Sequence, residues 1–285
     1  MHARFGFALA VRMNCKETEP QVSLREFQSA LGRLVRAAAG TPNGIAENAT
    51  SQLCGLDLTP EERASIARLV TSPGFRFTLE VQRSWCEGRA ASAARLTLSI
   101  IPSRQRHRLV QEWIEKGGGT ASLVTSEAEE FLEFIACHLE DPSHALTLCR
   151  MEQAVYRASQ LQGTFMPLEL STLSDPEVEL CAGRHGMMVL FFAEPQRLLA
   201  AVNRGLPLPQ LTMRPYPVLF APGLPSLFRP ATFEELALWE ALSQPVTLRA
   251  LLDQQHARET IETLAAVGAA TTVRAIKGDR AQAYL

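Results

Sequence analysis

The part of the chain that most limits its possible fold is the C-terminal stretch from Thr232 onward. Thr232 and Glu235 form a capping box, which predicts a helix over Thr232–Ser243. A turn at Pro245 follows, and Thr247 is placed to cap a second helix that runs to about Gln255. The first half of this stretch is therefore expected to form a helix, a turn and a helix.

A third helix and a strand are expected next. Arg258–Val267 predicts the helix, Gly268 is placed to end it, and the β-branched residues of Ala269–Ile276 favour a strand. The order helix, turn, helix, helix, strand is typical of a winged-helix module. We therefore expect residues 231–285 to form such a module.

The charge of this module does not suit a nucleic-acid ligand. Its third helix offers only Arg258 as a basic residue, beside Glu259 and Glu262. A protein that binds duplex DNA must neutralise several phosphates with Lys and Arg. From Leu227 onward carboxylates balance the basic side chains, which are Arg229, Arg249, Arg258, Arg274, Lys277 and Arg280. This balance favours a protein or peptide ligand and no nucleic acid.

The whole chain has the composition of a globular protein. Its 285 residues are 46% hydrophobic and 20% charged, with a formal net charge of −2, so we expect two or three compact units. No apolar run approaches the roughly 18 residues that cross a bilayer, so no membrane contact is expected. The 6 cysteines are scattered without paired spacing, which favours reduced thiols and a cytoplasmic location.

A short apolar patch near the start is not expected to act as a signal peptide. The patch runs over Phe5–Val11, Arg12 closes it, and no small-residue cleavage pattern follows before Lys16. We treat residues 1–22 as an N-terminal extension. Translation from Met13 instead of Met1 is an alternative, which a mass spectrum of the native protein would decide.

Residues 23–162 carry helical signals throughout. Thr59 with Glu62, and Ser126 with Glu129, form further capping boxes. Asp141–Pro142 opens a long helix through Cys149, Val155 and Tyr156. Apolar residues at helical spacing mark one buried face near the start and are Leu24, Phe27, Leu31, Leu34 and Val35. We expect an all-helical N-terminal domain.

The pattern changes after residue 162. Phe165–Leu170 alternates as a strand does, and Met187–Ala193 has the continuous apolar character of a buried strand. Tyr216–Phe220 is expected to form a third strand, and Pro217 favours a position at the edge of the sheet. Residues 163–230 are therefore expected to form a small α/β segment with a proline-rich connector. The fold class is α+β: a helical domain, a small sheet and the winged-helix-like module.

The strongest candidate metal ligands are Cys137, His138, His144 and Cys149. Zinc sites generally use tight pairs such as C-x-x-C, whereas adjacent Cys137 and His138 point to different faces of a helix. Cys149 suits a buried position, and His144 is expected at the surface in the first turn of the helix, so a structural role is favoured over metal binding. The nucleophile elbow, the phosphate loop and the dinucleotide motif are not found either. We expect no catalytic centre and no metal site in this chain.

Two polar segments are candidate interaction surfaces. One is the basic cluster Arg104, Arg106, His107 and Arg108, for which a solvated surface is the default and an acidic partner or phosphate the alternative.

The other polar segment is on the long helix. Arg150 and Arg157 are two turns apart on one face, and Glu152 and Tyr156 are four residues apart. Exposure to solvent is again the default, and an interface with a partner is the alternative. We take these four residues as candidate partner-interface residues.

Four segments of the chain carry a resemblance to a known family. They are Leu148–Ser159, Arg184–Pro195, Leu198–Val202 and Gly205–Pro209. These segments resemble the partner subunits of multinuclear non-haem iron-dependent oxidative enzymes, most closely the 3-thiaglutamate branch and more distantly the methanobactin branch. The similarity covers most of the chain from about Ser23, and its motifs are soft patterns without an invariant signature.

The resemblance implies a division of labour between two chains. In that family a separate barrel subunit holds the iron. The partner subunit forms a heterodimer with it and binds a ribosomal precursor peptide through a winged-helix-like element. A cysteine of the peptide is modified, and in the thiaglutamate branch the β-carbon of a C-terminal cysteine on a carrier peptide is excised. The resemblance therefore implies no cofactor in this chain and iron in its partner.

We expect the peptide to add as a strand to an open sheet edge in the C-terminal module. The predicted edge consists of Thr271, Thr272, Val273 and Arg274. Beside it are the helix residues Arg258, Ile261 and Glu262. The alternative is that these residues only complete the module and its core.

Two other classes of function remain open. One is a transcriptional regulator whose winged helix binds DNA, which requires a clustered basic face. The other is a hydrolase built on His185 or Cys181, which requires a convergent nucleophile and base.

Overall fold

The computed structural model describes residues 26–34, 53–56, 58–118, 127–254 and 256–273. The chain divides into two compact units, Met1–Val81 and Gln82–Leu285. The division falls inside helix α4 (Pro73–Ala93). The predicted Ser126 cap lies outside the described residues.

The first unit contains a helix over residues 26–34, helix α3 (Pro60–Thr71) and the start of α4. The predicted capping box of α3 is confirmed. The Thr59 hydroxyl accepts from the Glu62 N–H, and the Glu62 carboxylate accepts from the Thr59 N–H at 2.8 Å. The core of this unit is apolar and includes Ala30, Leu34, Leu53, Leu56, Leu58, Ile66, Val70 and Phe75.

The helical part of the second unit packs around one aromatic pair. Trp113 and Phe131 have ring centroids 4.9 Å apart and join two helices. The helices after α4 are α5 (Arg95–Ile100), α6 (Ser103–Glu115), α7 (Glu127–Ala136) and α8 (His144–Ser159). The predicted long helix therefore begins at His144, where the hydroxyl of Ser143 caps it.

A small antiparallel sheet has the strand order β2-β3-β4. Its strands are β2 (Met187–Phe191), β3 (Tyr216–Phe220) and β4 (Phe228–Pro230). The two predicted strands in this region are thus confirmed. β4 was not predicted.

The prediction that Pro217 places its strand at a sheet edge is wrong, because β3 is the middle strand. The N–H of Ala231 donates to the carbonyl of Pro217 at 2.9 Å, so the backbone groups of residue 217 face β4. β4 ends at Pro230. The N–H that proline lacks would have served only the last rung of this ladder, so its loss is tolerated.

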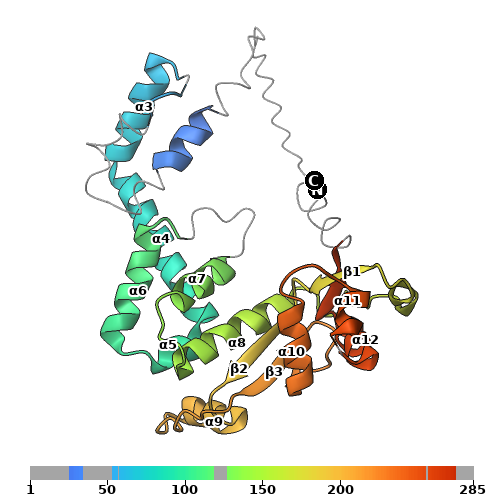
Figure 1. The fold of residues 1–285 in the computed structure, drawn as a ribbon. Helices are drawn as coiled ribbons and strands as arrows, with labels where there is room; N and C mark the ends of the chain where they lie inside the picture. The colour runs from blue at the N-terminus through green and yellow to red at the C-terminus, as the bar shows by residue number, and fades with distance from the viewer. Residues whose placement is uncertain (1–25, 35–52, 57, 119–126, 255, 274–285) are drawn as a thin grey trace, which may run out of the picture. The chain divides into compact units, whose positions relative to one another are not determined.

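This sheet separates two cores, because alternate residues point to opposite faces. On one face Val189, Val218 and Phe220 pack with Leu148 and Met151 of α8, which crosses the sheet in Figure 1. On the other face Met188 and Leu219 join the core of the C-terminal helices. The predicted domain boundary after residue 162 therefore falls within the core that α8 shares with this sheet.

A second antiparallel sheet has the order β5-β1-β6. Its strands are β1 (Glu179–Ala182), β5 (Val246–Thr247) and β6 (Ala270–Thr272). Only β6 lies in a predicted strand. The middle strand, β1, precedes the C-terminal module in the chain, so the module cannot complete this sheet from residues 231–285 alone within the part that the structure describes.

The three predicted C-terminal helices are confirmed. They are α10 (Phe233–Ala241), α11 (Leu248–Asp253) and α12 (Arg258–Ala266). Thr232 and Glu235 form the predicted capping box, and the Thr247 hydroxyl caps α11. Gly268 follows α12 with a left-handed φ of 79°.

A glycine turn links β1 of the second sheet to β2 of the first sheet. The N–H of Gly183 donates to the carbonyl of Ala269 at 2.7 Å. A Cβ on Gly183 would lie 2.2 Å from the carbonyl oxygen of Gly268. Only a residue without a side chain permits this approach.

Phe165–Leu170 does not form the predicted strand. The residues before Leu170 have no regular structure, and the 3₁₀ helix η1 (Leu170–Ser174) follows. The Phe165 ring packs on Gly223 and Gly268, close to where a Cβ of either would lie. The described residues thus form a mixed fold of helices and small antiparallel sheets, compatible with the predicted α+β class. None of their helices is long and apolar enough to cross a membrane.

Candidate functional site

The predicted peptide-binding residues do not form one exposed surface. Ile261 is fully buried in the C-terminal core, so it cannot contact a ligand there. Its neighbours Arg258 and Glu262 are bound to each other, with 2.9 Å between Nε and Oε1. Arg258 also donates to the carbonyl of Leu173 at 2.8 Å.

The predicted strand edge is described only in part. Thr271 and Thr272 belong to β6, Val273 follows it, and Arg274 lies outside the described residues. Thr271 pairs with Cys181 of β1, and the side chain of Thr272 is buried. β6 is an outer strand of the sheet as far as the structure describes it. Thr271 and Thr272 thus take part in the sheet, and addition of a peptide strand at this edge stays a prediction.

Two of the four predicted partner-interface residues stabilise the fold internally. Glu152 accepts from the N–H of Leu96 at 2.7 Å and from the hydroxyl of Thr97 at 2.6 Å, which caps the start of α5. Burial raises the pKa of this carboxyl, while its hydrogen bonds act in the opposite direction. Arg157 forms an ion pair with Glu129 of α7.

The other two residues have weaker ties. Arg150 donates to the side chain of Gln153 at 3.0 Å, and Tyr156 is partly exposed. The structure therefore does not bring the four residues together as one free face.

The residues weighed as metal ligands are not brought together. The Cys149 thiol donates to the carbonyl of Leu132, and burial raises its pKa to about 12. His144 is buried, with Nε2 at 2.7 Å from the carbonyl oxygen of Pro209, and its predicted surface position is wrong. In the described ranges no three His, Cys, Asp or Glu side chains are grouped to hold a metal ion.

His185 and Cys181, the candidates for a hydrolase, each contact the backbone. His185 Nδ1 lies 3.1 Å from the carbonyl oxygen of Arg157. The Cys181 thiol is directed at the carbonyl of Thr271, and burial raises its pKa. A raised pKa leaves the thiol protonated, which is the opposite of what an activated nucleophile requires.

The structure shows a site that the sequence analysis missed: a groove along the outer edge of β4. It consists of two adjoining cavities of about 410 Å³ and about 570 Å³. Both cavities touch Glu194, Pro195, Val218 and Pro230, so they form one continuous surface. We call this surface the β4 groove.

The smaller cavity is predominantly apolar. Helix α8 contributes Met151 and Val155, and helix α9 (Pro195–Arg204) contributes Leu199. Strand β4 contributes Phe228, which is 49% exposed and has its ring 5.6 Å from that of Phe220. An exposed aromatic side chain beside an apolar cavity is typical of a binding surface.

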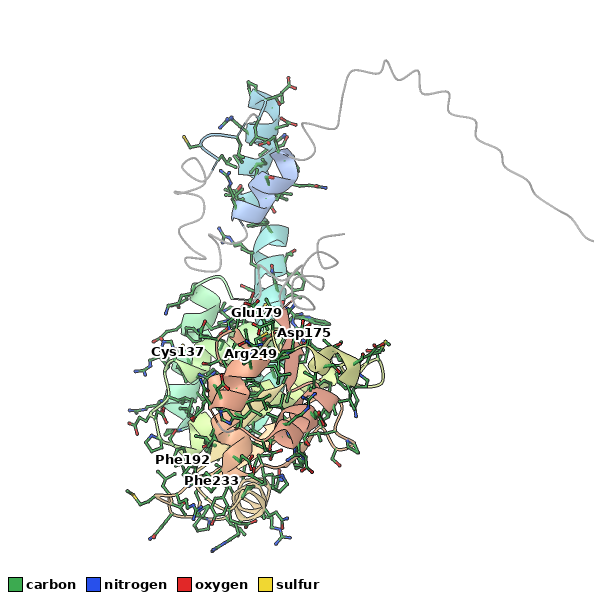
Figure 2. All side chains as sticks on the ribbon, turned by 45° about the vertical axis from the view of Figure 1, so that its right-hand side comes forward. Cys137, Asp175, Glu179, Phe192, Phe233 and Arg249 are labelled. Carbon is green, nitrogen blue, oxygen red and sulfur yellow. The ribbon has the colours of Figure 1, made fainter. Side chains whose placement is uncertain are left out.

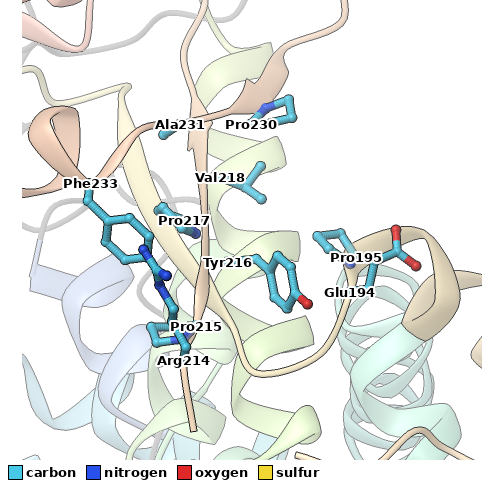
Figure 3. Close-up of a pocket in the computed structure, with 10 residues that line it drawn as sticks. All are labelled: Glu194, Pro195, Arg214, Pro215, Tyr216, Pro217, Val218, Pro230, Ala231 and Phe233. Atoms are coloured by element: carbon cyan, nitrogen blue, oxygen red, sulfur yellow. The ribbon is translucent and has the colours of Figure 1, made fainter. Parts of the chain in front are cut away.

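The larger cavity lies between the start of β3 and the starts of α9 and α10. Figure 3 shows Tyr216 directed toward Glu194 and Pro195, on the side of β3 opposite to Phe233. The guanidinium of Arg214 lies 4.5 Å from the centre of the Phe233 ring, a cation–π contact. Tyr216 and Phe233 are both exposed.

The charged side chains that line the β4 groove differ in whether they have a bonding partner. The Glu194 carboxylate accepts from the N–H groups of Gln196 and Arg197 at 3.2 and 2.9 Å, so it serves as the cap of α9. Neither Arg95 nor Arg214 forms an ion pair in the part of the chain that the structure describes, although burial raises the pKa of Glu152 and the charge of Arg95 acts to lower it. The groove therefore presents positive charge beside apolar walls.

The basic side chains of the C-terminal module are engaged differently. Arg229 binds Glu235, with 3.0 Å between Nη1 and Oε2, and this contact lowers the pKa of Glu235. Arg249 binds Glu177 at 2.8 Å, in the region where Figure 2 labels Arg249, Asp175 and Glu179. Since Arg258 is bound to Glu262, each arginine described from Leu227 onward is matched by a carboxylate.

Comparison with models of known protein families and with curated protein sequences gave no match. The sequence signal for the β4 groove is weak, because β4 has only three residues and ends in a proline. Its walls come from several helices and strands that are distant in the sequence, and no local pattern links them.

Proposed function

We propose that this chain is a peptide-binding accessory subunit of an iron-dependent peptide-modifying complex. In this proposal a separate barrel subunit holds the iron and carries out the oxidation, and this chain presents the cysteine of a carrier peptide to it. Excision of the β-carbon from a C-terminal cysteine, as in 3-thiaglutamate formation, is the reaction that the sequence resemblance supports. The unpaired thiols of the described cysteines support a reducing, cytoplasmic setting.

The arrangement of the C-terminal elements supports a winged-helix-like module. The chain order is α10, β5, α11, α12, β6, in which two successive helices lie between two strands as in such a module, and β1 is the middle strand of the sheet. In DNA-binding helix-turn-helix proteins the second helix of the motif enters the major groove. Helix α12 holds the corresponding place in this module.

The observation that carries the proposal is the pairing of Arg229, Arg249 and Arg258 with carboxylates. A helix that reads DNA keeps its arginines available for phosphates and bases. Here the one arginine of α12 is bound both to a carboxylate and to a backbone carbonyl. Such a module suits a polypeptide ligand better than a nucleic acid.

Co-expression with the product of a neighbouring reading frame for an iron-binding barrel tests the proposal. We expect the two chains to elute together from a size-exclusion column as a heterodimer, with iron present only when the barrel subunit is present. Iron should be quantified by mass spectrometry in the complex and in each chain purified alone.

The alternative of a DNA-binding regulator is tested by measuring the binding of labelled duplex DNA at several salt concentrations. Strong binding that falls steeply with salt would favour the transcriptional regulator. Iron bound stoichiometrically by this chain alone, or turnover without a second chain, would also contradict the accessory role.

A further inference from the structure

The outer edge of β4 has a definite hydrogen-bonding pattern. The N–H of Ala221 donates to the carbonyl of Leu227, and the N–H of Ala231 donates to that of Pro217. In an antiparallel ladder such pairs alternate with residues whose backbone groups point away from the partner strand. The register pairs Arg229 with Leu219, so Arg229 faces β3 and both of its neighbours in β4 face outward.

Phe228 is the residue of this edge that can pair with another chain. Among the described residues, its backbone N–H and carbonyl are not hydrogen-bonded. Pro230 also faces outward, but it has no N–H, and its carbonyl already accepts from the Arg229 guanidinium at 2.9 Å. An extended peptide can therefore exchange one donor and one acceptor with Phe228, which sets its register.

The cavity beside this edge suits side chains of the same peptide. A strand added to β4 would lie about 4.8 Å beyond it, with alternate side chains on the face that carries the Phe228 ring. That face opens on the cavity of about 410 Å³, whose far wall is formed by Met151, Val155 and Leu199. Backbone pairing would supply affinity, and an apolar side chain in this cavity would supply selectivity.

The charged side chains of the groove indicate which residues the peptide should carry besides the apolar ones. Arg95 lies at the rim of the same cavity and Arg214 in the adjoining one. The one carboxylate that lines both, that of Glu194, is held by the backbone of α9. Acidic side chains between the apolar ones would complement the two guanidinium groups.

We propose that the β4 groove binds an extended peptide segment in which apolar and acidic residues alternate, paired with the backbone of Phe228. This inference rests on the proposed peptide-binding function and assigns it to a surface separate from the predicted edge at Thr271. The expected ligand is a strand with an apolar anchor and flanking carboxylates.

Fluorescence anisotropy with short fluorescein-labelled peptides tests the proposal on the full chain. The first probe alternates Leu and Glu, and the second replaces each Glu by Lys. The third has the sequence of the first with alternate backbone nitrogens methylated. It is made in two versions, which block strand pairing on one edge of the extended peptide or on the other. We expect saturable binding of the first probe and weak binding of the other two.

Two variants examine the walls of the groove. Val155→Asp places a charge in the apolar cavity and should weaken binding of the first probe by at least about tenfold. Val81→Asp on α4 is its matched control, because Val155 and Val81 are exposed helical valines with 37% and 39% of their surface accessible. Val81→Asp should bind as the parent chain does.

A charge reversal examines the rim. Arg95→Glu should weaken the Leu-Glu probe by about fivefold and strengthen the Leu-Lys probe by a similar factor, as expected of an exposed charge pair. Arg104→Glu, in the basic cluster of α6, is the control with the same change of charge. Circular dichroism of every variant should match the parent spectrum.

The results separate this proposal from the function on which it rests. Equal binding of the first probe to Val155→Asp and to the parent chain would overturn the assignment of the groove. So would the conversion of a parent dimer into a monomer by Val155→Asp, because a second copy would then be the occupant. Formation of the iron-containing heterodimer by the parent chain without any binding of the first probe would leave the accessory role standing and the groove refuted.

Discussion

Glu152 illustrates how a residue predicted to lie at an interface has an internal role instead. Its carboxylate accepts from two N–H groups and one hydroxyl at the start of α5. Glu152→Ala would leave these donors without an acceptor in a partly buried site, so we expect a loss of about 2 kcal/mol in the free energy of unfolding. Urea denaturation at neutral pH measures it. A loss below about 0.5 kcal/mol would contradict the role as a cap.

The pH dependence of the same site has a defined sign. Because burial raises the pKa of Glu152 in the folded chain, the folded state holds its proton to higher pH than the unfolded state. The stability from this group is therefore greatest below the unfolded pKa and falls as pH rises through the folded pKa. Glu152→Gln should remove that slope, which urea midpoints over the acid range would show.

Glu235 shows the opposite sign. Its bond to Arg229 lowers the pKa of the carboxyl, so its stabilising effect is present above the unfolded pKa and is lost as pH falls through the folded pKa. Glu235 is 7% exposed and Arg229 is 31% exposed, so Glu235→Gln should cost about 2 kcal/mol at neutral pH and less in acid. Thermal unfolding at neutral pH and at acidic pH measures this difference in stability.

A surface pair serves as the control for Glu235. Glu177 and Arg249 are 59% and 62% exposed, and water screens such pairs well. Glu177→Gln should change the free energy of unfolding by no more than about 0.5 kcal/mol. Equal effects of the two substitutions would contradict the difference in burial.

At the scale of elements, the turn after α12 depends on a glycine. Gly268 has a φ of 79°, and a Cβ there would lie 2.5 Å from the Phe165 ring. Gly268→Ala combines left-handed strain with overpacking and should cost about 2–4 kcal/mol. Gly205→Ala after α9 is the control, because Gly205 has a φ of 64° and no atom within 4 Å of the added Cβ.

Gly205→Ala should lower the free energy of unfolding only by the backbone strain, about 1–2 kcal/mol. Chemical denaturation of both variants measures the difference. Similar losses at the two glycines would show that the Phe165 ring moves aside without cost.

Local signals explain which elements the sequence predicts well. The helices α3 and α10 begin at capping boxes, where the stabilising contact joins residues three apart, so the pattern is visible without the fold. Strands β1, β4 and β5 have two to four residues each and depend on partners elsewhere in the chain. Such short strands carry no periodic signal of their own.

The same distinction applies to the candidate site. Ile261 lies on the apolar face of α12, and helical periodicity alone could have assigned it to the core. The β4 groove requires α5, α8, α9 and β4 to be placed in space, which no local pattern provides. Glu152 was recognised as polar and helical, but its role depends on the position of α5.

Because the chain divides into two units inside α4, we expect a fragment that holds only the second unit to fold. The core clusters of the sheets, of α8 and of the C-terminal helices all lie after Gln82. We expect a fragment of residues 82–285 to keep its near-ultraviolet circular dichroism and to unfold cooperatively. Loss of that signal would show that residues 1–81 are needed to stabilise the rest.

The position of β1 in the middle of its sheet has a consequence for synthesis. Thr271 is translated 90 residues after its partner Cys181. At roughly 5–20 residues per second this interval is on the order of ten seconds, and until Thr271 is translated the edge of β1 that pairs with β6 is unpaired in the nascent chain. A neighbouring ribosome on the same message can supply a competing strand during this time. Slower initiation, which spaces ribosomes further apart, should therefore raise the yield of correctly folded chain.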